Sequence, residues 1–103
     1  MTTDSVIRQQ GDGVLQLVGV LDFRTGAQLR SEGEKLIRAS NAATVVVDCA
    51  EVEHASSVGL SLLLAYMRVA KQAGKGLAVR ALPVEMRQIA EVSGLLEILP
   101  LQA

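Results

Sequence analysis

The stretch from Thr44 to Lys75 constrains the fold of this chain more than any other part of its sequence. Residues 44–47, Thr-Val-Val-Val, form a short β-branched run that is typical of a buried strand. After a polar turn, apolar residues recur at helical spacing: Leu60, Leu63, Leu64, Met67 and Ala70. The stretch therefore predicts a strand, a turn and a helix, which together form one βα unit.

Two serines, Ser56 and Ser57, lie where this helix would take its N-cap, and Gly59 follows closely. A serine oxygen at a helix start accepts hydrogen bonds from backbone N–H groups that have no partner inside the helix. The same oxygen faces the surface, so a partner protein or a kinase can also read it. Capping alone is the commoner outcome, and recognition by a partner is the second interpretation.

Length and composition predict a single domain. The chain has 103 residues, which is enough for one modest hydrophobic core and too few for two. Half of the residues are apolar, but only Phe23 and Tyr66 are aromatic, so the core must consist mainly of Leu, Val, Ile and Ala. The net charge is −1 and the charges are interspersed, which favours neither nucleic acid nor an anionic membrane surface as a partner.

The sequence also predicts the compartment. Cys49 is the only cysteine, which excludes an internal disulfide and fits a reducing environment; we expect an inert buried residue there. Residues 1–5 are polar and acidic, so we expect no secretory signal. The apolar run at 60–67 is far shorter than the roughly twenty residues that span a bilayer. These features predict a cytoplasmic protein without direct membrane insertion.

The first part of the chain predicts a hairpin and a helix. Residues 6–10 and 14–20 read as strands joined by Gly-Asp-Gly, whose residues tolerate the positive φ of a tight turn. Asp22 or Thr25 could cap the helix that follows. The helical spacing rests on Ala27, Leu29 or Arg30, Leu36 and Ile37. Gly33 inside this helix costs about 1 kcal/mol relative to alanine, so packing around it must compensate.

The last third predicts a further strand and helix. Gly74-Lys75-Gly76 ends the central helix, residues 77–82 read as a strand, and Pro83 opens a last helix. We expect this helix to bury a stripe formed by Met86, Ile89, Ala90 and Val92. Residues 95–101 are too apolar for a free tail and should pack on the sheet edge. The elements together predict a mixed sheet of four or five strands, with helices mainly on one face.

The order of these elements and the residues at their junctions resemble the STAS domain, the fold of anti-sigma-factor antagonists. The resemblance covers nearly the whole chain and rests on four segments: 19–22 (Gly-Val-Leu-Asp), 45–48 (Val-Val-Val-Asp), 56–60 (Ser-Ser-Val-Gly-Leu) and 74–77 (Gly-Lys-Gly-Leu). It implies one α/β STAS domain over residues 1–103. Within the family, the chain is most similar to the small cytoplasmic subunit of phospholipid-transporting ABC systems.

The resemblance also implies a site at Ser56, Ser57 and Gly59. Members of the family commonly have an Asp followed by a Ser or Thr just before a Gly-Leu pair, and the hydroxyl residue is phosphorylated or contacts a partner. Here Ser57 takes the hydroxyl position, Ser56 replaces the Asp, and Val58 stands where Gly or Ser is usual. Loss of the carboxylate weakens the case for a kinase-read switch, but it leaves a capping or contact role intact.

Two functions follow from the resemblance. The first is an accessory subunit that binds and stabilises a transporter ATPase, in a system that moves phospholipids to maintain outer-membrane lipid asymmetry. Such a protein is peripheral to the inner membrane through its partner. The alternative is an anti-sigma factor antagonist, switched by serine phosphorylation, whose partners are an anti-sigma factor and a serine kinase. Neither function implies a cofactor.

An enzyme is the least favoured class. One histidine, one cysteine, no G-x-x-x-x-G-K loop and no metal-ligand cluster leave no convergent set of catalytic groups. His54 lies three residues before Ser57, but the spacing implies no acidic group that would orient it as a base. We interpret Asp22 and Asp48 as loop residues at strand ends rather than as paired catalytic carboxylates. The sequence therefore predicts no catalytic or metal-binding residue.

Overall fold

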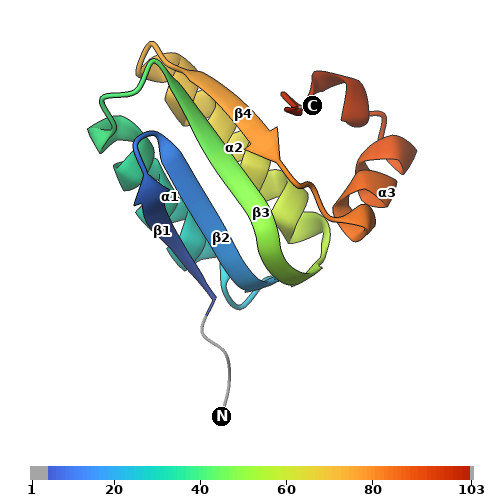
Figure 1. Cartoon of the computed structure of the whole chain (residues 1–103). Helices are drawn as coiled ribbons and strands as arrows, with labels where there is room; N and C mark the ends of the chain where they lie inside the picture. The colour runs from blue at the N-terminus through green and yellow to red at the C-terminus, as the bar shows by residue number, and fades with distance from the viewer. Residues whose placement is uncertain (1–4, 103) are drawn as a thin grey trace.

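The computed structural model describes residues 5–102 and contains one four-stranded sheet (Figure 1). In chain order the elements are β1 (Val6–Gly11), β2 (Val14–Leu21), α1 (Gly26–Ala39), β3 (Thr44–Ala55), α2 (Ser57–Gln72), β4 (Gly76–Arg80), α3 (Val84–Val92) and the 3-10 turn η1 (Leu96–Ile98). Residues 1–4 lie outside the described residues. They make up most of the N-terminal segment in which we expect no secretory signal.

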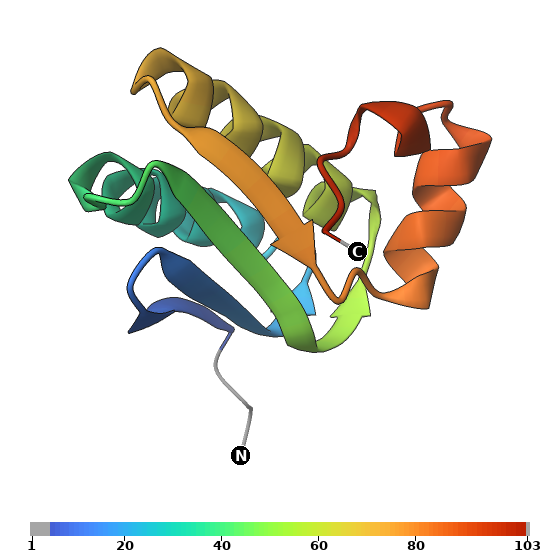
Figure 2. The same ribbon diagram turned by 45° about the horizontal axis from the view of Figure 1, so that its top comes forward.

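The sheet is mixed and has the strand order β1-β2-β3-β4. β1 and β2 form an antiparallel hairpin, whereas β3 runs parallel to both of its neighbours, β2 and β4. Parallel neighbours need crossover connections, which α1 and α2 supply. Both helices lie on the same face of the sheet, and α3 lies beyond the β4 edge (Figures 1 and 2). The predicted α/β architecture, with the 45–47 strand near the sheet centre, is confirmed.

The main hydrophobic core fills the space between the sheet and the two crossover helices. Its members are mostly aliphatic, as the composition predicts, and Leu63 of α2 is completely buried. The large side chains that are fully buried are Leu17, Leu21, Leu29, Ile37, Val45, Val47, Leu63, Tyr66, Val79 and Met86.

Tyr66 explains the glycine inside α1. Its hydroxyl donates a hydrogen bond to the Leu29 carbonyl at 2.5 Å. A Cβ at position 33 would overlap the Tyr66 ring, so only glycine lets the ring lie against α1. Burial raises the pKa of Tyr66, which keeps the hydroxyl protonated as a donor. The backbone cost of Gly33 is therefore offset by the burial of a large aromatic side chain.

β3 is much longer than the sequence predicted. We expected a strand at 44–47 and then a turn, but β3 continues to Ala55, and Ser56 alone separates it from α2. The prediction was wrong because the polar residues at 48–54 resemble a turn. In the structure, two register irregularities between β2 and β3 accommodate extra residues in β3 and let this polar segment stay in the sheet.

Asp48 consequently lies inside β3 and not in a loop at a strand end, which corrects a second prediction. The register aligns Arg8, Gln16, Asp48 and Arg80 in one row across the four strands. Arg80 Nη2 donates to Asp48 Oδ2 at 2.9 Å, and the Ala50 N–H donates to Asp48 Oδ1 at 2.9 Å. Burial alone would raise the pKa of Asp48, but these two partners hold it below its usual value. Asp48 is thus a structural, paired carboxylate.

A second, smaller hydrophobic cluster attaches α3 and the C-terminal segment to α2. Its buried members are Leu60, Ala90 and Leu99. Pro83 immediately precedes α3 rather than lying in its first turn. Val92 is 91% exposed, so its predicted place in the buried stripe was wrong: it lies about 200° around the helix from Ala90. The C-terminal segment packs on the sheet edge as predicted, through a bridge between Leu101 and Val79.

Candidate functional site

Ser56 is the residue that caps α2. Its backbone is extended (φ −92°, ψ −172°), and its Oγ accepts a hydrogen bond from the Val58 N–H at 3.1 Å. The Ser56 hydroxyl and N–H also donate to the Leu21 carbonyl, at 3.3 and 3.0 Å. Ser56 therefore joins the start of α2 to the end of β2. It supplies the capping oxygen that an aspartate could otherwise provide at this position.

Ser57 is the first residue of α2, and its side chain is exposed. The side-chain hydrogen bonds of this serine pair belong to Ser56, which leaves the Ser57 hydroxyl available at the surface. The first turn of a helix carries unpaired backbone N–H groups and the positive end of the helix dipole. The Ser57 hydroxyl thus lies at the surface, where a negative group would be electrostatically favoured.

Gly59 supports this junction from inside. It is buried, and a Cβ at this position would lie 3.2 Å from the Ala55 Cβ and 3.3 Å from the Leu21 Cδ1 and the Met86 Cε. These contacts are tighter than ordinary packing, so glycine allows α2 to begin close to β2, β3 and α3. Of the three predicted site residues, Ser56 and Ser57 are both exposed, Ser56 is the cap of α2, and Gly59 is a buried packing residue.

An apolar groove lies at the first turn of α2, and its main residue was not predicted from the sequence. Phe23 has 83% of its surface exposed and lines a groove of about 320 Å³ between the first turns of α1 and α2. Gly26 brings the two helices together there, because a Cβ at this position would lie 2.7 Å from the Val58 Cγ1. The groove is lined further by Ala27, Arg30, Ser61 and Leu62. The sequence signal that could have identified Phe23 is a single aromatic residue within a polar loop.

The loop that carries Phe23 is held by local hydrogen bonds. Asp22 Oδ1 accepts from the Arg24 N–H at 2.9 Å, and Asp22 Oδ2 accepts from Arg24 Nη2 at 2.9 Å. The Arg24 side chain is the main cause that lowers the pKa of Asp22. Thr25 Oγ1 donates to the Val20 carbonyl at 2.9 Å; Thr25 is the N-cap of α1 but forms no side-chain cap bond. Asp22 thus lies at a strand end as predicted, paired with arginine.

His54 and Cys49, the single histidine and the single cysteine, each have their own surroundings in the structure. His54 Nδ1 lies 3.5 Å from Glu85 Oε1, so its acidic neighbour comes from α3. Burial raises the pKa of the Cys49 thiol to about 12, which makes it a poor nucleophile at neutral pH. Within residues 5–102, no group of three His, Cys, Asp or Glu residues could hold a metal ion. No helix in this part of the chain is both long enough and apolar enough to cross a membrane.

Comparison with known proteins identifies the family. A family model described as "Mlab, STAS domain" matches residues 5–100. The chain therefore belongs to the STAS domain family, in agreement with the resemblance at its helix and strand junctions. Among curated proteins, none matches the sequence.

Solved structures show the same fold. A chain in the Acinetobacter MlaFEDB complex, in an ATP-bound conformation, is 25% identical; the match covers 86% of this chain and 93% of that one, with a TM-score of 0.72. An anti-sigma factor antagonist from Mycobacterium paratuberculosis is also 25% identical, with 98% and 89% covered and a TM-score of 0.73. SpoIIAA in its unphosphorylated form, at 19% identity, 94% and 86% coverage and a TM-score of 0.70, supports the fold alone.

Proposed function

We propose that the protein is a non-catalytic accessory subunit that docks on the ATPase of an Mla-type ABC transporter and stabilises it. Such a transporter moves phospholipids and maintains outer-membrane lipid asymmetry, and the protein would lie on the cytoplasmic side of the inner membrane through this partner. The observation that carries the proposal is the exposed Phe23 in a groove that is also lined by Val58, the residue next to the exposed Ser57 on α2. The family description and the MlaFEDB relative support the choice of partner.

The chemistry of this surface supports docking by packing. We call Phe23, Ser57, Val58, Ser61 and Leu62 the Ser57 surface. Exposed aromatic side chains at the edge of an apolar groove supply large contact areas and often dominate binding energies. Arg24 and Arg30 beside the groove already pair with Asp22 and Glu34 at 2.9 Å. The surface therefore offers little unpaired charge, and shape and apolar area are its main means of recognition.

The alternative function is an anti-sigma factor antagonist that a serine kinase switches by phosphorylating Ser57. The exposed hydroxyl at the positive end of α2 favours this alternative, because a helix start stabilises a phosphate. Replacement of the preceding carboxylate by Ser56 argues against it. A gene beside a transporter ATPase and permease supports the first function, whereas one beside a serine kinase and a sigma factor supports the second.

Substitutions at Ser57 and Phe23 test the proposal. Ser57→Ala removes an exposed hydroxyl but leaves the Ser56 cap, so we expect docking close to that of the parent. Ser57→Asp and Ser57→Arg place an unpaired charge in the contact, where its desolvation costs several kcal/mol. Phe23→Ala removes the exposed ring with little effect on folding. We expect the last three variants to lose co-purification with the ATPase subunit and to reduce transporter ATPase activity.

The matched control for Ser57→Arg is Gln72→Arg, which adds the same positive charge at the exposed far end of α2. We expect it to dock like the parent, and thermal melts show that every variant is folded. If Ser57→Ala abolished docking while Ser57→Asp behaved like the parent, the docking proposal would be wrong. Stoichiometric phosphorylation of Ser57 by a kinase in the cell lysate would instead support the antagonist function.

A further inference from the structure

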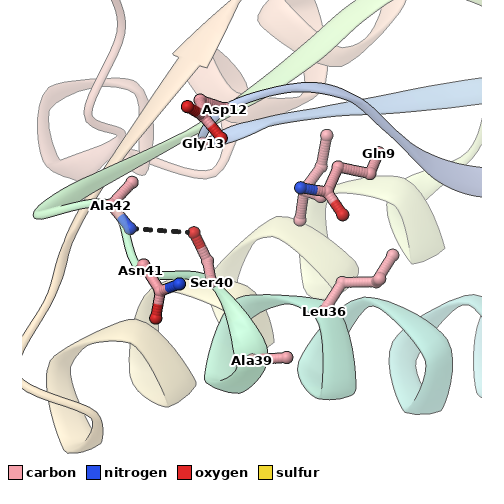
Figure 3. Close-up of a pocket in the computed structure, with 9 residues that line it drawn as sticks. Gln9, Asp12, Gly13, Leu36, Ala39, Ser40, Asn41 and Ala42 are labelled. Carbon is pink, nitrogen blue, oxygen red and sulfur yellow. Dashed lines mark hydrogen bonds between the residues drawn. The ribbon is translucent and has the colours of Figure 1, made fainter.

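A second candidate site lies at the opposite end of α1 from the Ser57 surface. A pocket of about 340 Å³ lies between the β1–β2 hairpin and the loop that follows α1 (Figure 3). Gln9, Asp12 and Leu15 of the hairpin line one side, and Leu36, Ser40 and Asn41 line the other. Because α1 has 14 residues, about 20 Å separates this pocket from the groove at Phe23. A ligand here would leave the Ser57 surface free.

The two walls of the pocket are fixed to each other. The hairpin turn touches the loop so closely that a Cβ at Gly13 would lie 2.7 Å from the Ala42 Cβ. The Val46 N–H donates to the Gly13 carbonyl at 2.7 Å, which ties the turn to the start of β3. Ser40 Oγ accepts from the Ala42 N–H at 3.2 Å and shapes the loop, as Figure 3 shows. The pocket is therefore held open by contacts within the fold.

Lys75 holds the α1 side of the pocket in place. Its Nζ donates to the carbonyls of Ile37, Arg38 and Ser40, at 2.6, 2.9 and 2.5 Å. An ammonium group that satisfies the last carbonyls of a helix also interacts favourably with the negative end of the helix dipole. The loop that carries Ser40 is thus anchored before any ligand arrives, which lowers the ordering cost of binding.

The lining combines an apolar floor with a polar rim. Leu36 is half-buried and packs against the main core, so it offers apolar surface to the pocket, and the buried Leu15 gives this floor a rigid base. Figure 3 shows the Gln9 amide between the hairpin and Leu36, and Asp12 at the turn above. Asp12 is the one ionisable residue in the lining. None of the ion pairs among residues 5–102 involves Asp12.

We propose that this pocket binds a small organic cation, an alkylguanidinium or alkylammonium, with its head at Asp12 and Gln9 and its methylene groups on Leu36. The carboxylate disfavours anions, and the amide oxygen accepts hydrogen bonds from a cationic head. Methylene groups bury against an apolar floor while the charged end stays in water. Because Asp12 is exposed, the charge adds modest affinity, and binding depends on floor and rim together.

Three probes with alkyl chains of three or four carbons test the assignment: butylguanidinium, the neutral butyramide and the anion butyrate. Each is titrated into the full ¹⁵N-labelled chain. We expect butylguanidinium to give saturable shifts at the backbone amides of Gly13, Leu36, Asn41 and Ala42, butyramide to bind more weakly, and butyrate not to bind. Absence of saturation in the tens of millimolar range, or equal shifts with butyrate, would overturn the proposal.

Asp12→Asn tests the role of the carboxylate and suits the turn, since asparagine tolerates the same backbone conformations. We expect it to weaken butylguanidinium binding about fivefold and to leave butyramide binding unchanged. The control Glu97→Gln removes an exposed carboxylate on η1 and should change nothing. An equal loss in both variants would indicate non-specific charge attraction and would refute the site.

A capped arginine, N-acetylarginine methylamide, distinguishes a free small cation from an arginine side chain of a protein. We expect it to bind no more tightly than butylguanidinium, because the pocket holds a head and a short chain. Tighter binding of the capped arginine would overturn the small-molecule assignment in favour of a protein partner. All these readouts are independent of the Ser57 surface, so their outcome does not depend on the ATPase docking proposal.

Discussion

The two hydrophobic clusters of this protein differ in how completely they exclude water. In the main core, the side chains of Leu17, Leu63 and Tyr66 are fully buried between the sheet and the crossover helices. The cluster at α3 has three buried residues and is otherwise built from half-buried ones, while Val84 and Val92 of α3 are 68% and 91% exposed. Since stabilisation scales with the apolar area removed from water, α3 is attached more weakly than α1 or α2.

Both candidate sites depend on the better-packed region. The Ser57 surface is formed by the starts of α1 and α2, and the pocket at Asp12 is formed by the hairpin and the end of α1. The Tyr66 ring of α2 packs against Gly33 of α1 and fixes the two helices to each other between the two sites. The main core therefore determines the geometry of both sites, and α3 approaches the start of α2 through Met86 near Gly59.

The largest expected contrast comes from equivalent truncations in the two clusters. Leu63→Ala removes a side chain that is 0% exposed and should cost about 3–5 kcal/mol of the free energy of unfolding. Leu99→Ala, at 6% exposure in the less enclosed cluster, should cost about 2 kcal/mol. Urea unfolding measures both values. Native-state hydrogen exchange should also show faster opening of α3 amides alone in Leu99→Ala, whereas equal losses throughout the sheet would mean that the clusters unfold as one unit.

Most of the fold could be predicted from the sequence because periodicity and turn residues agree over most elements. The hairpin has its Gly-Asp-Gly turn, and α2 has a helical apolar stripe after a hydroxyl cap. β3 could not be delimited, because a polar strand with register irregularities carries no period-two pattern. Asp48 was wrongly predicted to lie in a loop because the end of β3 was placed too early. Its partner Arg80 also comes from a strand distant in sequence, so the ion pair could not be predicted.

The candidate site was only partly predictable. The junction motif located Ser56, Ser57 and Gly59, but the sequence could not assign cap, surface and packing roles among them, because those roles depend on contacts with β2 and α3. Phe23 was missed because an exposed aromatic has no periodic partner in the sequence. The pocket at Asp12 is formed by segments about thirty residues apart, which the β2–β3 pairing and the packing of α1 on the hairpin bring together.

A smaller effect is expected where β3 meets β4, the strand that leads to α3. Asp48→Asn removes the ion pair with Arg80 and should cost about 1 kcal/mol at pH 7. The folded-state pKa of Asp48 is lowered, so its stabilisation is present above the unfolded value of about 4 and disappears as the pH falls through the folded-state pKa. The gap between parent and variant should therefore shrink at low pH. Urea titrations at pH 7 and pH 2.5 measure it, and an unchanged gap would contradict this role.

The smallest expected effect lies at the connection between the two regions. Ala81, between β4 and α3, has φ +58°, a left-handed conformation that costs a non-glycine residue roughly 1–2 kcal/mol. Ala81→Gly relieves this strain but raises the entropy of the unfolded chain, so we expect a net gain of only about 0.5 kcal/mol. Ala81→Val keeps the strain and adds a branched side chain that fits this conformation poorly, so it should destabilise.

Hydrogen exchange of these two variants locates the effect. Because Ala81 is exposed and precedes α3, its strain acts on the docking of α3 and η1, while α1, α2 and the β2–β3 pair stay together through the main core. We expect Ala81→Val to speed exchange in α3 and leave the amides of β2 and β3 unchanged, with Ala81→Gly acting in the opposite direction. If Ala81→Val increased the exchange rate equally in β2, the strain at this connection would act on the whole domain. The conclusion that α3 is attached more weakly than α1 and α2 would then be wrong.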